Sequence, residues 1–214
     1  MGKYSDQLMS KSVISPDKEI VIVDEDYISK EPTTIIFNIK ENFSYEFEIL
    51  DSNGKECYRT KAKSLSDTRF VYDLKDKPLV SIKEGFTTDK IFSEKKTKKE
   101  IAKIKPKNST KAHKYEIEYS NKATRKDEIL NMNCSNSFTA IGIFNGREKE
   151  GATMVCRIRR TSEEKFLSSK YQYTMEIAPN VDTLFMITLG IYILRHKSNE
   201  SNAFYVASAC AATV

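Results

Sequence analysis

Side chains that could carry out catalysis are few and isolated in this sequence. The two histidines are His113, in a lysine-rich stretch, and His196, directly after a long apolar segment. Neither accompanies a Gly-x-Ser-x-Gly nucleophile motif, and the sequence has no P-loop, GxGxxG or HExxH pattern. Carboxylate groups such as Asp24-Glu25-Asp26 and Glu163-Glu164 lie in predicted turns, where side chains are usually solvated. We therefore expect no catalytic residues and a protein that is not an enzyme.

Cofactor and metal chemistry also lacks a motif. The four cysteines, at positions 57, 134, 156 and 210, are far apart and form no Cys-x-x-Cys pair. Zinc sites and small disulfide frameworks need patterned cysteines, so we expect reduced thiols, no metal and no cofactor. The first residues, MGKYSDQLMSKSV, lack the apolar stretch of a secretory signal peptide, which favours a cytoplasmic location.

Positive charge is the chemical feature that stands out. Residues 83–126 contain fourteen Lys and Arg against six Asp and Glu, in a chain of formal net charge +5. Such a stretch forms either a solvated face or a surface attracted to phosphate groups, as in anionic lipid or nucleic acid. The sequence does not separate these interpretations.

Most of the chain predicts short β-strands. In residues 44–50, Tyr45, Phe47 and Ile49 alternate with polar side chains. The turn Asp51-Ser52-Asn53-Gly54 follows, so the next strand returns antiparallel, and a second Asn-Gly pair stands at 145–146. We predict a barrel or sandwich of ten to twelve strands. They are expected at residues 33–39, 44–50, 56–61, 69–74, 79–83, 91–92, 101–105, 115–119, 129–134, 138–144, 154–159 and 171–177.

One segment, residues 181–196, predicts a helix instead. Asn180 provides a capping residue, Asp182 an acid in the first turn, and Arg195 and His196 cations at the end. Its side chains are apolar on nearly every face, so it must be surrounded by protein or lipid. About 14 residues at roughly 1.5 Å each reach about 21 Å, short of a bilayer core of roughly 30 Å. We therefore expect a core helix and no transmembrane segment, with the buried residues Leu184, Phe185, Ile187, Leu189, Ile191 and Leu194.

Three segments of the sequence resemble a known family. They are DSNGKECYRT at residues 51–60, DTRFVYDLKDKPLVSI at 67–82 and YTMEIAPNVDTLF at 173–185. In a β-rich chain that ends in an apolar helix, they resemble the LURP-one-related family of the tubby C-terminal-like superfamily, which also includes phospholipid scramblases. The resemblance covers residues 19–197, leaving 1–18 as a flexible N-terminal segment and 198–214 as a C-terminal tail. It implies a closed antiparallel barrel of about twelve strands around the helix, which would also remove exposed sheet edges.

The resemblance also implies a type of ligand. Tubby-type domains bind phosphoinositide through basic residues on a strand that follows a hairpin, and Arg59, Lys61 and Lys63 occupy a comparable place here. No segment matches the calcium-binding segment proposed for scramblases, so scramblase activity is not implied.

Two functions remain open at this stage. One is peripheral binding to anionic phospholipid or phosphoinositide at the cytoplasmic face of the plasma membrane. The other is a soluble scaffold for a protein partner in stress or defence signalling. We expect a monomer and no nucleic-acid partner.

Overall fold

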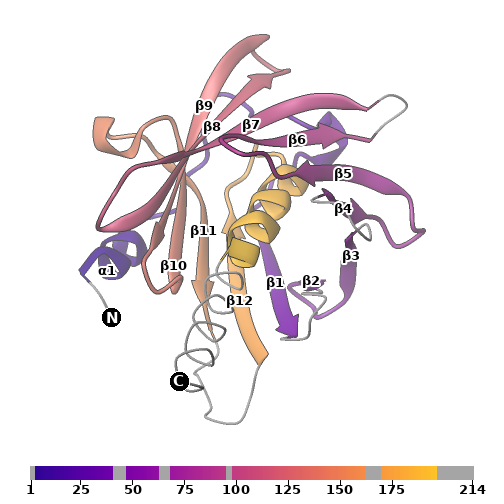
Figure 1. Ribbon diagram of the computed structural model, residues 1–214, viewed down its shortest axis with the longest axis horizontal. Coiled ribbons are helices and arrows are strands. Elements are labelled where there is room, and N and C mark those ends of the chain that lie inside the picture. Colours follow the sequence, from indigo (N-terminus) through magenta and orange to yellow (C-terminus); the bar gives the residue numbers. More distant parts are fainter. Residues whose placement is uncertain (1–2, 41–46, 63–67, 95–97, 162–169, 197–214) are drawn as a thin grey trace, which may run out of the picture.

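The computed structural model describes residues 3–40, 47–62, 68–94, 98–161 and 170–196. Twelve strands in these residues form one closed barrel around a helix (Figure 1). The strands are β1 (Thr33–Lys40), β2 (Phe47–Asp51), β3 (Glu56–Ala62), β4 (Thr68–Tyr72), β5 (Pro78–Lys83), β6 (Asp89–Ser93), β7 (Lys99–Lys107), β8 (Ala112–Asn121), β9 (Lys126–Ser135), β10 (Ala140–Asn145), β11 (Met154–Arg160) and β12 (Lys170–Ile177). The prediction of a mainly β, closed antiparallel barrel is confirmed.

The strands follow one another around the barrel in chain order, and each is antiparallel to both neighbours. β1 closes the ring because it pairs with β12 on one side and with β2 on the other. Inward side chains such as Tyr115, Ile117 and Tyr119 of β8 alternate with outward polar ones, as the sequence pattern predicts. Closure gives every strand two partners and so leaves no sheet edge exposed.

The helix inside the barrel, whose described part covers residues 183–196, is called the central helix below (Figure 1). The six side chains expected in the core, Leu184, Phe185, Ile187, Leu189, Ile191 and Leu194, are all fully buried. Gly190 allows the helix to approach the wall closely, because a Cβ there would lie 2.6 Å from Met175 Cε and 3.0 Å from Phe37 Cζ. Within the described residues, no helix has the length and apolar character needed to span a bilayer.

The start of the central helix is fixed by a buried carboxylate, that of Asp182. One oxygen, Oδ1, accepts a hydrogen bond from the amide of Phe185 at 2.9 Å, so Asp182 caps the helix. The sequence-based choice of Asn180 as the capping residue is therefore wrong. Asn180 instead adopts a left-handed backbone conformation (φ 63°), and its side-chain amide donates to Ser15 Oγ at 3.1 Å.

The other Asp182 oxygen connects the N-terminal part of the chain to the start of the central helix. Oδ2 accepts from the amides of Ile22, Val23 and Asp24 at 3.1, 2.6 and 3.3 Å. Burial raises the pKa of Asp182, and the four amide hydrogen bonds act in the opposite direction. The segment before β1 is thus part of the packed domain.

The N-terminal residues are also more ordered than the sequence suggests. We expected residues 1–18 to be flexible, but α1 (Lys3–Ser10) is a helix on the outside of the barrel, against β10 (Figure 1). Leu8 is fully buried there with Phe144 and Met154, and Tyr4 donates to Glu148 at 2.7 Å. The helix is difficult to predict from its short polar sequence, because one leucine, Leu8, and one tyrosine, Tyr4, supply the contacts that anchor it. The predicted C-terminal tail, residues 198–214, lies outside the described residues.

Candidate functional site

The two ends of the barrel differ in the part of the central helix that they contain. In an up-and-down barrel, alternate turns lie at the same end. The turns at 52–55, 73–77 and 122–125 lie at the end where the central helix starts, called here the Asp182 end. The turns at 84–88, 108–111 and 136–139 lie at the opposite end, which contains Tyr192 and Arg195 of the central helix and is called the Tyr192 end.

The hairpin between β5 and β6, residues 84–88, is attached to the last described turn of the central helix. Tyr192 donates its hydroxyl to Asp89 Oδ2 at 2.7 Å, and the amide of Gly85 donates to Asp89 Oδ1 at 2.8 Å. Arg195 forms an ion pair with Glu84 on the same hairpin. Burial and the contact with Asp89 raise the pKa of Tyr192, which keeps this hydroxyl protonated. The hairpin is therefore held in place by two side chains of the helix.

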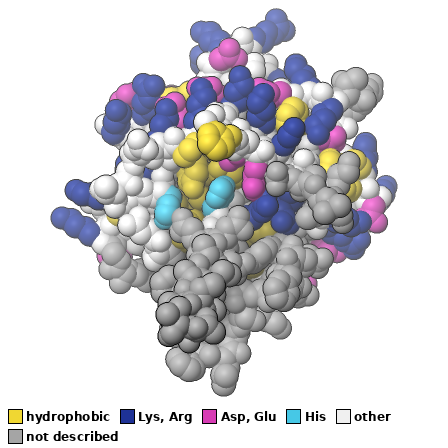
Figure 2. Space-filling model, in the orientation of Figure 1, with side chains coloured by type: hydrophobic (Ala, Val, Ile, Leu, Met, Phe, Trp, Pro, Cys, Tyr) yellow, Lys and Arg dark blue, Asp and Glu magenta, His cyan; other side chains and the backbone are white. Residues whose placement is uncertain are grey.

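A large apolar side chain lies at the tip of this hairpin. Phe86 is fully exposed, at 105% relative accessibility, whereas the next most exposed large apolar side chains of the described residues, Ile14 and Leu74, are at 54% and 41%. Gly85 beside it has no room for a Cβ, which would lie 2.3 Å from the carbonyl oxygen of Thr88. Figure 2 shows hydrophobic side chains gathered at the centre of this face, with histidine, acidic and basic side chains around them.

Three lysines lie in a row across the strands directly below the hairpin. Lys83 of β5 is aligned with Lys90 of β6, and Lys90 with Lys103 of β7. All three point outward, since their neighbours Ile82, Ile91 and Ala102 face the core. Like charges side by side on adjacent strands destabilise a sheet. We call Lys83, Lys90 and Lys103 the lysine row.

One carboxylate offsets part of this charge. Glu100 pairs with Lys90 at 2.8 Å and with Lys103 at 3.5 Å, and the two lysines hold the pKa of Glu100 below its ordinary value. No ion pair of Lys83 is present among the described residues. Glu118 of β8 is aligned with Lys103 at the far end of the row, so the excess of positive charge is greatest at Lys83, at the base of the hairpin that carries Phe86.

The basic residues expected from the sequence are arranged differently. Arg59 is on β3 and forms a bidentate pair with Glu56, with its Nη2 2.8 Å from Glu56 Oε2. Lys61, two residues on, pairs with Asp76 at 2.7 Å and lies over the Tyr72 ring. These cations lower the pKa of Glu56 and Asp76, so each positive charge is matched by a neighbouring negative one. Lys63 lies outside the described residues.

Much of the remaining basic stretch is compensated in the same way. Lys105 pairs with Glu118 at 2.6 Å, and Lys107 with Glu116 at 2.8 Å, both across β7 and β8. Figure 2 accordingly shows Lys and Arg side chains mixed with acidic ones over this part of the barrel. Ion pairs between strands thus reduce the local excess of positive charge that the sequence shows. In the lysine row, by contrast, lysines of three strands are aligned with one another.

The two histidines, His113 and His196, pack against aromatic rings. The His113 ring stacks on Phe138 at 4.6 Å, and the His196 ring contacts Tyr192 at 4.6 Å. Arg69 is buried on the inner side of β4, where burial and the nearby Arg195 lower its pKa to about 10. Within the described residues, no group of three or more His, Cys, Asp or Glu side chains could hold a metal ion.

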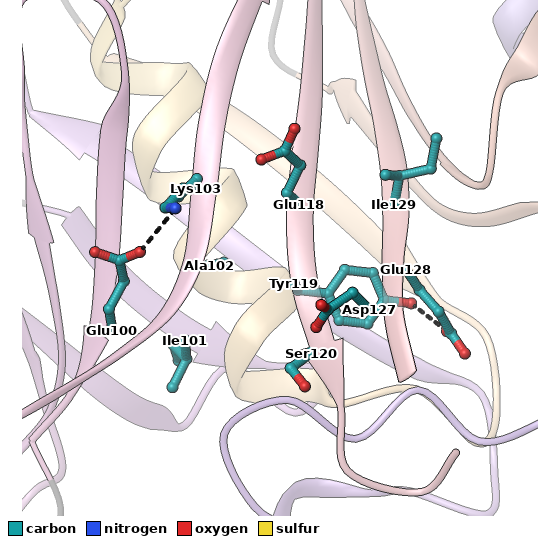
Figure 3. A pocket seen from close by; sticks show the side chains of 10 residues that line it. All are labelled: Glu100, Ile101, Ala102, Lys103, Glu118, Tyr119, Ser120, Asp127, Glu128 and Ile129. Atoms are coloured by element: carbon teal, nitrogen blue, oxygen red, sulfur yellow. Dashed lines mark hydrogen bonds and ion pairs between the residues drawn. The ribbon is translucent and has the colours of Figure 1, made fainter. Parts of the chain in front are cut away.

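A second surface feature is a depression of about 440 Å³ on the outside of β7, β8 and β9 (Figure 3). Four carboxylates line it, those of Glu100, Glu118, Asp127 and Glu128, along with Lys103. Figure 3 shows Tyr119 reaching toward Glu128, to which its hydroxyl donates at 3.0 Å, and Glu100 facing Lys103. This depression has acidic character and lies beside the lysine row.

Sequence reasoning did not find Phe86 or the lysine row. The available signal was a lone aromatic residue in the short turn segment Glu84-Gly85-Phe86-Thr87-Thr88, and a lysine lies on either side of this segment. Lys103 could not be added to this group without the strand register, which pairs it with a residue thirteen positions earlier.

The chain is similar to a known protein family and to a solved structure. A family model described as LURP-one-related matches residues 35–194. No match was found among curated proteins. An X-ray structure of a protein from Arabidopsis thaliana is similar, with a TM-score of 0.60 and 22% sequence identity, covering 81% of this chain and 96% of that chain. At this identity the structural likeness shows the shared fold.

Proposed function

The chain belongs to the LURP-one-related family, and we propose that it is a non-enzymatic protein that binds anionic phospholipid through its outer surface. In this proposal it acts as a monomer in the cytoplasm and associates peripherally with the plasma membrane. Phosphoinositides are the preferred headgroups because they offer several phosphate charges to neighbouring lysines.

The filled interior supports an outer binding surface. Side chains from Leu184 to Leu194 occupy the barrel and are buried against its wall. A barrel whose interior is packed with side chains has no room there for a lipid tail. Ligands therefore meet the protein at the outer faces of the strands and at the turns.

The lysine row is the observation that carries the proposal. Three lysines lie at aligned positions of β5, β6 and β7, and one carboxylate, Glu100, is shared by Lys90 and Lys103, so part of the mutual repulsion of the row remains in the free protein. An anionic surface relieves this repulsion, and each lysine near such a surface contributes about 1 kcal/mol. By contrast, Arg59 and Lys61 each pair with a carboxylate of their own, Glu56 and Asp76, whereas Lys90 and Lys103 share Glu100.

Sedimentation with vesicles tests the proposal. Purified protein is mixed with phosphatidylcholine vesicles that contain or lack phosphoinositide, at low and physiological salt. We expect pelleting that depends on the anionic lipid and weakens with salt, because screening reduces attraction between exposed charges. Absence of pelleting with every vesicle at low salt would refute the proposal.

Matched triple variants then locate the surface. Alanine at Lys83, Lys90 and Lys103 should abolish most of the pelleting. Alanine at Lys55, Lys75 and Lys77, exposed residues at the Asp182 end, removes the same charge and should have a small effect. A third variant, alanine at Arg59, Lys61 and Lys63, tests the site expected from the family resemblance.

A protein partner is the second candidate, supported by the acidic depression of Figure 3. Its net acidic lining, in which Glu100 and Glu118 pair with lysines and Glu128 accepts hydrogen bonds, and the partly exposed Ile101 and Ile129 suit a basic peptide segment with apolar side chains. This function predicts binding that persists without lipid and is lost when Glu118 and Asp127 are changed to glutamine.

A further inference from the structure

The hairpin of residues 84–88 has the features of a membrane-inserting tip. We propose that Phe86 enters the interfacial layer of an anionic bilayer while Lys83, Lys90 and Lys103 contact the lipid phosphates. This inference rests on the lipid-binding function proposed above and assigns the element that penetrates the membrane.

The exposure of Phe86 is the first step of the argument. A fully exposed phenyl ring forgoes the free energy that burial would provide, and the apolar layer of a bilayer would supply that burial. Its position at the end of a hairpin lets it enter a bilayer without displacing the strands.

The second step is the rigidity of the support. Asp89 bonds both the Gly85 amide and the Tyr192 hydroxyl, and Glu84 pairs with Arg195. The hairpin is thus attached to the helix that fills the barrel, and Phe86 is held away from the barrel wall. Little conformational freedom has to be lost on binding, which favours affinity.

The third step is the charge around the tip. Lys83 and Lys90 are aligned with one another at the base of the hairpin, and Lys103 extends the row on β7. An aromatic side chain with lysines at its base matches an anionic lipid surface, where the ring enters the apolar layer and the ammonium groups remain at the phosphates. An electrically neutral apolar partner would leave the row unused.

The test uses the fact that the chain contains no tryptophan. Phe86→Trp then provides the only tryptophan, and Leu74→Trp, at a turn of the Asp182 end, is the matched control. With phosphatidylcholine vesicles containing phosphatidylserine or phosphoinositide, we expect the Phe86→Trp emission to shift to the blue and to be quenched by brominated lipid. The Leu74→Trp emission should not change.

A second pair of variants measures affinity. Phe86→Ser should weaken vesicle binding at least about tenfold with an unchanged melting temperature, because its side chain is fully exposed, and Leu74→Ser should weaken binding less than about twofold. Pelleting of Phe86→Trp without a blue shift or quenching would overturn this inference and leave lipid binding through the lysines intact. Absence of pelleting for the unmodified protein would overturn both proposals.

Discussion

Each end of the barrel buries one aspartate against the central helix, and the two aspartates are satisfied by different groups. Asp182 accepts four backbone amides, three of them from residues 22–24, more than 150 positions earlier in the chain. Asp89 accepts one amide, that of Gly85, and the hydroxyl of Tyr192. The backbone donors to Asp182 connect the N-terminal segment to the helix, whereas the Tyr192 hydroxyl fixes a single hairpin.

This difference gives the two ends of one helix different structural roles. At the Asp182 end its first turn fixes the N-terminal segment and completes the fold. At the Tyr192 end its last described turn positions a short hairpin whose tip, Phe86, faces solvent. The first end is expected to dominate stability and the second to dominate binding, and the following variants test that division.

The largest expected effect comes from a charge placed in the core near the Asp182 end. Leu184→Asp puts a carboxylate into a fully buried apolar position, which should cost at least about 4 kcal/mol and abolish cooperative unfolding. Circular dichroism during thermal melting measures this, with the exposed substitution Ile14→Asp as control. An unchanged melting curve for Leu184→Asp would show that the helix does not occupy the barrel.

A somewhat smaller loss is expected from Asp182→Ala. It leaves the buried amides of Ile22, Val23 and Phe185 without their acceptor, at a cost of about 3 kcal/mol or more. Asp182→Asn keeps one acceptor oxygen and avoids burying a charge, so its loss should be clearly smaller. Urea denaturation of the three proteins gives this order, and equal losses for the two variants would contradict it.

At the opposite end, Tyr192→Phe should have a moderate effect. It removes the hydroxyl that Asp89 accepts but keeps the ring in the core, so we expect a loss of about 1 to 2 kcal/mol. Amide exchange of Gly85 should also become faster, because the hairpin loses one anchor. A destabilisation as large as that of Asp182→Ala would remove the proposed distinction between the two ends.

The smallest effect concerns acid sensitivity at the Asp182 end. Burial raises the pKa of Glu128, but hydrogen bonds from Thr124, Asn121 and Tyr119 outweigh it and leave the pKa below the ordinary 4.5. Glu128 therefore stabilises the fold above pH 4.5, and this contribution disappears as the pH falls through the lowered folded-state pKa. Glu128→Gln should cost about 1 kcal/mol at neutral pH.

The pH profile provides the control for this variant. Urea unfolding at neutral pH and well below pH 4.5 should give a difference between Glu128→Gln and the unmodified protein that shrinks with acid. A difference that stays constant would mean that the charge of Glu128 is not involved.

Much of the fold was predictable because its signals are local. Alternation of apolar and polar side chains reports a strand from its own residues, and each of the twelve predicted ranges overlaps an observed strand, with residues 44–46 of the second range lying outside the described residues. The Asn53-Gly54 turn also has the expected positive φ at Gly54, 78°. The second pair, at 145–146, instead begins a longer connection that contains the 3-10 helix Glu148–Glu150, since residues beyond the pair determine the length of a connection.

The binding surface was less predictable because charge in the sequence does not show its partners. Arg59 and Lys61 are compensated by Glu56 and Asp76, and Asp76 is fifteen residues from Lys61. Likewise, the anchoring of α1 depends on Leu8 meeting β10, more than 130 residues away. Such contacts depend on strand register and on packing between distant segments.

By itself, the sequence determined that this chain forms many short strands and one helix that must be buried, because side-chain periodicity and apolar character act within a few residues. Only the tertiary structure decided that Asp182 and not Asn180 caps that helix, which lysines align, and that Phe86 is held in solvent. Those features arise from hydrogen bonds and strand pairings between residues far apart in the chain, whose free energies exist only once the barrel has closed.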